Sequence, residues 1–197
     1  MGENSVLDGL EYEASSGRLS YKGVRYLLIR PETLVAFQLA VEAEVGPEKC
    51  AELMQAGGFT GGALSARRYR DVFGYSDRET AEFMCRMGSE IGWGHFRLVR
   101  LDVAGREMTV EVVGSPFAEA YRALRPSPPD ASPVGTALAA TSPGVSPVGR
   151  AGEGVCHFIR GVLAGLGAGL FGSEVVSAET TCQARGDLRC RFEVRGA

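Results

Sequence analysis

The residues of this sequence best suited to chemistry are three cysteines and a glutamate near its C-terminal end. Cys156 precedes a glycine-rich apolar stretch, and Glu179, Cys182 and Cys190 follow it within 35 residues. Zinc is bound tetrahedrally by thiolate sulfur and carboxylate oxygen. These four side chains therefore make a candidate metal shell.

The spacing of the four candidate ligands makes demands on the local structure. If Ala184 pairs with Leu188 across a three-residue loop, Cys182 lies directly opposite Cys190, with Cβ atoms about 5 Å apart. Glu179 precedes Cys182 by three residues, which points it to the other face of a regular strand. A bend or bulge must therefore intervene if both are ligands. Two alternatives remain open: a Cys182–Cys190 disulfide, and cysteines that are simply buried apolar side chains.

The pattern Cys156, then Glu179-x2-Cys182-x7-Cys190 and a strand over 190–194 resembles the 4-vinyl reductase domain family. The resemblance is specific over residues 153–194 and looser over 24–124. In the family's aromatic-sensing transcription activators such a set holds a structural zinc, so the resemblance implies zinc as the cofactor. It also implies an α+β fold in which helices flank an antiparallel sheet, as in vesicle-tethering subunits.

The resemblance implies a binding or sensory domain for a small hydrophobic ligand, because relatives bind aromatics, hydrocarbons or acyl chains. A homodimer is implied too, and a separate output protein is a further expected partner. Two alternatives stay open: an accessory protein or reductase component of tetrapyrrole metabolism, and a dimeric assembly module. The sequence has no nicotinamide or flavin motif, and a zinc with four protein ligands leaves no position for substrate. Binding is therefore favoured over catalysis.

A candidate ligand pocket lies around a predicted helix, a strand hairpin and a short helix. The phenol-sensing members of the family place a ligand-binding histidine at a helix-to-strand junction, so the resemblance makes His95 the polar anchor, with Trp93 as a wall. The other expected pocket residues are Phe83, Met87, Phe96, Phe117 and Tyr121. The alternatives are an aromatic cluster that only fills the core and a structural or exposed histidine.

The elements that position these residues can be placed from apolar periodicity and turn residues. Helices are expected from Pro31 to the Gly46-Pro47 stop, over 48–56, over 77–91 and over 117–124. The second helix should break at Gly57-Gly58 and Gly61-Gly62. Ser76 and Glu79 form a capping box for the third. Strands are expected over 24–29, where the run should be buried, and in a hairpin over 96–103 and 107–113.

Gly161, Gly165 and Gly169 share one face of the helix that follows Cys156. Each costs about 1 kcal/mol of helix propensity relative to alanine. A close approach by another helix, a subunit or a ligand would compensate for that cost.

Composition favours one domain over residues 1–197, interrupted by a flexible Pro/Ser/Ala-rich insert at 125–152 that holds six of the nine prolines. The net charge of −3 leaves no basic footprint, so direct nucleic-acid binding is not expected. The longest apolar run, Val162–Phe171, is too short to span a membrane. Five cysteines without a secretory signal favour the cytoplasm.

Overall fold

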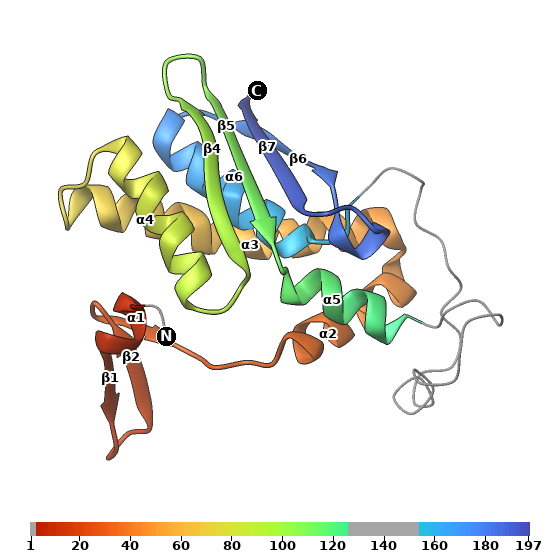
Figure 1. Ribbon diagram of the computed structural model, residues 1–197, viewed down its shortest axis with the longest axis horizontal. Helices are drawn as coiled ribbons and strands as arrows, with labels where there is room; N and C mark the ends of the chain where they lie inside the picture. Colours follow the sequence, from red (N-terminus) through yellow and green to blue (C-terminus); the bar gives the residue numbers. More distant parts are fainter. Residues whose placement is uncertain (1–2, 126–153) are drawn as a thin grey trace.

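A four-stranded antiparallel sheet forms the centre of the computed structural model, which describes residues 3–125 and 154–197 (Figure 1). Its strands are β4 (His95–Asp102), β5 (Glu107–Val113), β6 (Val175–Thr181) and β7 (Cys190–Gly196), in the order β4-β5-β7-β6. Alternate residues of β5 and β7 point to one face and are buried there. With helices packed on that face, the expected α+β class is confirmed.

Two helices, α3 (Pro47–Asp71) and α6 (His157–Phe171), pack against each other behind the sheet (Figure 1). The predicted break at the double glycines is wrong, because α3 is one continuous helix. Gly58 and Gly62 instead face α6, where an added Cβ would lie 2.2 Å from the Phe158 carbonyl oxygen and 2.0 Å from that of Val162. The glycines are there because two backbones nearly touch, not because the helix ends.

The glycine face of α6 meets α3 in the same way. An added Cβ at Gly161 would lie 2.2 Å from the Gln55 carbonyl oxygen, and one at Gly165 would lie 2.1 Å from that of Phe59. At Gly169 it would lie 2.6 Å from the Cβ of Ala66. Of the three expected partners for this face, the structure selects another helix. The opposite side of α6 contacts the sheet, where Gly167 faces Val194.

Three further helices cover the remaining sides: α2 (Pro31–Val45), α4 (Asp77–Glu90) and α5 (Pro116–Leu124). The Ser76–Glu79 capping box at the start of α4 is confirmed. Gly46 separates α2 from α3 at a positive φ of 84°, a conformation that favours glycine. None of the described helices has the length and apolar character that a membrane crossing requires.

The N-terminal part forms its own small sheet of β1 (Leu10–Glu13), β2 (Arg18–Tyr21) and β3 (Val24–Tyr26), preceded by α1 (Ser5–Asp8). The expected buried strand over 24–29 is only partly formed, because β3 ends at Tyr26. Leu27, Leu28 and Ile29 continue as a connection to α2 and are 80%, 89% and 59% exposed. Within the described part of the chain, no strand pairs with these three residues.

Lys22 attaches this small sheet to the helices. Its ammonium lies 4.9 Å from the ring centre of Phe73 and 5.7 Å from that of Phe83. Arg68 of α3 donates a hydrogen bond to the Lys22 carbonyl oxygen at 2.7 Å. The small sheet is therefore held at the corner between α3 and α4. The predicted insert at 125–152 lies, apart from Arg125, outside the described residues.

Candidate metal centre and ligand cavity

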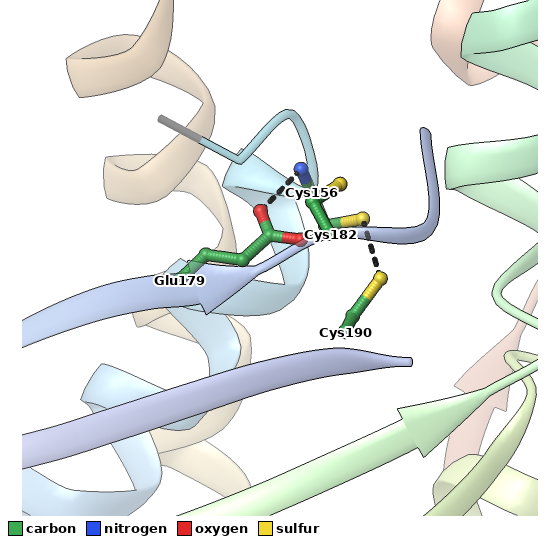
Figure 2. A group of neighbouring side chains, drawn as sticks. All are labelled: Cys156, Glu179, Cys182 and Cys190. Carbon is green, nitrogen blue, oxygen red and sulfur yellow. Dashed lines mark hydrogen bonds between the residues drawn. The ribbon is translucent and has the colours of Figure 1, made fainter. Parts of the chain in front are cut away.

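Four side chains converge where β6 and β7 meet the start of α6 (Figure 2). The thiol sulfurs of Cys156, Cys182 and Cys190 and a carboxylate oxygen of Glu179 all lie within 4.8 Å of one another. All four residues are at least 95% buried. The sequence-predicted set is thus brought together, and the group could hold a metal ion.

Each member of the group is positioned by the end of an element. Cys156 is the N-cap of α6, Cys190 begins β7, and Cys182 directly follows β6. Glu179 pairs with Phe192 while Thr181 pairs with Arg191, so β6 carries one extra residue at this point. This is the predicted bulge, and it lets the carboxylate and the Cys182 thiol reach the same space.

The predicted three-residue loop between β6 and β7 does not form. Residues Gln183–Arg185 make a 3-10 turn that ends at Gly186, whose φ of 94° is left-handed. The Asp187 carboxylate accepts a hydrogen bond from the Cys182 N–H at 2.7 Å. These local bonds replace the strand pairing expected between Ala184 and Leu188, and they leave both thiols pointing inward.

The sulfurs are in contact but not bonded. All five cysteines of the chain are free, and the Cys156 and Cys190 sulfurs lie 3.8 Å apart. Hydrogen bonds from these two thiols lower the pKa of Cys182 to about 2, and burial raises the pKa of Glu179 to about 8. Without a cation the cluster therefore holds a single thiolate, because further negative charge in a buried space is unfavourable.

A metal ion fits the donor set. One oxygen of Glu179, Oε2, accepts a hydrogen bond from the Cys156 N–H at 2.9 Å (Figure 2). The other, Oε1, is buried without a hydrogen-bond partner among the described residues. Gly154 lets the carboxylate approach, since an added Cβ there would lie 2.0 Å from Oε2. Three sulfurs and an unpartnered oxygen suit a divalent cation that accepts thiolate ligands.

A cavity of about 560 Å³ lies between the N-terminal sheet, α4 and α6. Four of the seven predicted pocket residues line it: Met87, Trp93, Phe96 and Phe117. The Trp93 ring meets the rings of Phe117 and Phe158 edge-on, with centres 5.6 and 5.7 Å away. The wall is mainly aliphatic and aromatic.

The structure does not bring the other three predicted residues to this cavity. His95 is exposed and borders a shallow depression beside Arg78 and Glu82, because strand alternation points it away from its inward-facing neighbour Phe96. Tyr121 is buried but faces α2, where its hydroxyl donates to Glu42 Oε2 at 3.2 Å. Phe83 packs on Tyr69, with ring centres 4.4 Å apart, on a different face of α4 from Met87.

Sequence reasoning missed much of the cavity wall. The N-terminal sheet contributes Leu10, Leu19 and Tyr26, and the connection after it contributes residues 27–29. From α6 come Phe158, Val162 and Leu166, whose spacing of four was visible beside the glycines. The strand residues carried no such signal, because nothing in a short β-strand indicates which distant helix it faces.

Comparison with known proteins gives a family and a fold. The family model of the 4-vinyl reductase domain matches residues 139–196, which confirms the resemblance over the part of the chain that holds the metal-binding group. No curated protein sequence matches the chain.

Three solved structures resemble the chain. The phenol-responsive sensory domain of the transcription activator PoxR, solved with phenol, has a TM-score of 0.75 at 17% identity and covers 98% of this chain and 87% of its own. A vinyl-4-reductase family protein from Methanocaldococcus jannaschii gives 0.50 at 15% identity, covering 87% and 84%. A trafficking protein particle complex subunit 3 from Naegleria fowleri, covalently bound to palmitic acid, gives 0.47 at 12%, covering 84% and 93%. At these identities the likeness concerns the fold.

Proposed function

We propose that this chain is a zinc-stabilised domain that binds a small hydrophobic molecule in the cavity beside Trp93. The observation that carries the proposal is the cavity itself. Its volume of about 560 Å³ falls within the range typical of small-molecule sites, and its wall is mainly aliphatic and aromatic. The likeness in fold to a phenol-responsive sensory domain supports a sensory role.

Zinc is the metal that we assign to the buried group of Cys156, Glu179, Cys182 and Cys190. Three thiolates and one carboxylate oxygen complete a tetrahedral shell and leave no open coordination position. A zinc held in this way is structural, and it would tie the start of α6 to the β6–β7 end of the sheet. This assignment supports binding rather than catalysis as the role of the chain.

Binding can be tested through Trp93, because it is the only tryptophan of the chain and it lines the cavity. We expect small arenes to change its fluorescence in a saturable titration at submillimolar to millimolar concentration. If no arene, phenol or aliphatic hydrocarbon does so, the proposal fails.

Two glycine substitutions on α3 locate the binding site. Gly61 lines the cavity, and an added Cβ there meets nothing within 4 Å, so Gly61→Leu should fill the cavity without disturbing the fold. Gly57 lies one turn earlier, is equally open and does not line the cavity. We expect Gly61→Leu to abolish binding and Gly57→Leu to retain it. Equal binding by both variants would place the ligand elsewhere.

The homodimer and the separate output protein belong to the same proposal. Leu27, Leu28 and Ile29 are exposed apolar residues beside the cavity, and contiguous apolar surface of this kind is typical of interaction sites. A second subunit that covered them would also cover the cavity wall. Sedimentation equilibrium tests the dimer, and a concentration-independent monomer would contradict it.

A further inference from the structure

The apolar cavity contains one phenolic hydroxyl among the described residues that line it, that of Tyr26 at the end of β3. Tyr26 lines the cavity, and its hydroxyl lies 3.7 Å from the sulfur of Met87, which also lines it. Met87 is on α4, so this contact joins the N-terminal sheet to the helix across the cavity wall. A hydroxyl at such a position decides which polar group a ligand can carry.

The Tyr26 hydroxyl already receives a hydrogen bond from the protein. Tyr69 is buried behind it, and its hydroxyl lies 3.4 Å from the same Met87 sulfur. The hydrogen bond between the two tyrosines opposes the rise that burial causes in the pKa of Tyr26, and it adds to the rise in the pKa of Tyr69. That pattern identifies Tyr69 as the donor and Tyr26 as the acceptor.

The proton of Tyr26 is therefore directed at a poor acceptor. A thioether sulfur accepts hydrogen bonds only weakly. A ligand oxygen placed at the cavity end of Tyr26 would offer a stronger acceptor, while Tyr69 would continue to satisfy the Tyr26 oxygen. The exchange replaces a weak hydrogen bond with an ordinary one and leaves no buried group unpaired.

The other polar groups of the wall fit this arrangement less well. The Glu90 carboxylate is engaged by α1, accepting from the Ser5 hydroxyl at 2.6 Å and from the Val6 N–H at 3.0 Å. Ser65 is the remaining aliphatic hydroxyl of the wall. No arginine, lysine or histidine is found among the described residues that line the cavity, so a carboxylate ligand would be buried beside Glu90 without a cation.

We propose that Tyr26 selects ligands of this domain by donating its hydroxyl proton to a neutral oxygen acceptor on an otherwise apolar molecule. The ligand class is a small arene that carries one carbonyl, ether or hydroxyl oxygen, and carboxylates are excluded. The inference rests on the proposed function, because it concerns the same cavity.

The test compares molecules of matched shape with and without the acceptor: acetophenone with cumene, and phenol with toluene, plus benzoate as the anion. Tyr26→Phe keeps the ring and removes only the hydroxyl. It should weaken acetophenone and phenol about fivefold, the effect of one neutral hydrogen bond, and leave cumene and toluene unchanged. Benzoate should not bind the unsubstituted protein. Affinities are measured by isothermal titration calorimetry, with thermal unfolding to check that each variant is folded.

Three variants serve as controls. Tyr121→Phe removes a tyrosine hydroxyl outside the cavity, and His95→Ala removes the exposed histidine; neither should alter any affinity. A Tyr26→Phe variant that binds all four neutral molecules as the unsubstituted protein does would overturn the inference. A selective loss of the oxygen-bearing ligands in Ser65→Ala, with none in Tyr26→Phe, would overturn it as well. Failure of every arene to bind the unsubstituted protein would overturn the proposed function itself.

Discussion

At the scale of single residues, charge in buried or crowded places sets the strongest constraints. The cluster at Cys156, Glu179, Cys182 and Cys190 gathers four groups that become anionic as metal ligands, in a space that excludes water. Such a cluster is unfavourable when fully ionised and favourable around a cation. Its stability should therefore depend on metal.

We expect Cys182→Ser to lose the bound zinc and to destabilise the fold by about 3 kcal/mol or more, as loss of a structural metal does. Zinc content by elemental analysis and the free energy of unfolding by urea titration measure the two effects. Cys50→Ser and Cys85→Ser are matched controls, because both thiols are buried and neither belongs to the cluster. A zinc-free unsubstituted protein that is fully folded would contradict the assignment.

A second residue-scale prediction concerns pH. Glu111, on the outer face of the sheet, binds Arg97, Arg189 and Arg191, and these hydrogen bonds lower its pKa from 4.5 to about 2. The carboxylate is thus more stable in the folded state than in the unfolded one. Its contribution should be complete above pH 4.5 and should disappear as pH falls toward 2.

Glu111→Gln tests this directly. The variant should be less stable than the unsubstituted protein near neutral pH, by about 1 kcal/mol, because the arginine partners are partly exposed and screened by solvent. That difference should shrink as the pH is lowered from about 5 toward 2 in urea titrations. A difference that stays constant over this range would show that the loss is one of packing rather than charge.

At the scale of elements, α3 and α6 cross at very close range, and glycine makes this contact possible. The two backbones approach so closely that a methyl group has no room on either helix at the crossing. Burial of this contact compensates for the poor helix propensity of five glycines, Gly58 and Gly62 on α3 and Gly161, Gly165 and Gly169 on α6.

Gly62→Ala should therefore destabilise the fold by about 1–3 kcal/mol, the usual cost of overpacking, because its Cβ would meet the Val162 backbone. Gly57→Ala has open space and should stabilise by about 0.5–1 kcal/mol through helix propensity alone. Urea titration of both variants measures the contrast. Equal effects would mean that α3 and α6 do not pack in this register.

At the scale of the whole molecule, the described residues on the two sides of the insert form one structure. The central sheet takes β4 and β5 from the first part of the chain and β6 and β7 from the second, joined where β5 pairs with β7. The α3–α6 contact makes the same connection on the helical side. Neither part can bury its apolar surface alone.

We expect residues 3–125 and 154–197, produced as two polypeptides, to associate and to regain helical and sheet structure on mixing. Circular dichroism and co-purification measure this. Val110→Asp should prevent it, because Val110 is fully buried opposite Phe192. Val113→Asp, at an exposed position of the same strand, should not. Fragments that fold separately and do not bind each other would contradict the single-domain arrangement.

The sequence by itself determined the features that depend on near neighbours. The ligand spacing required a bulge between Glu179 and Cys182, and the structure has it. The capping box at Ser76, the hairpin of β4 and β5 and the close-packed glycine face of α6 were all predictable. Each of these depends on residues a few positions apart, so propensity and periodicity suffice.

Only the tertiary structure decided which distant surfaces meet. Gly58 and Gly62 end no helix, because their partner is α6, about one hundred residues away in the chain. The cavity takes a wall from the N-terminal sheet, and the direction of His95 follows from the face of β4 that packs on α4. Long-range packing supplies the free energy in these cases, and it overrides the local preferences that the sequence displays.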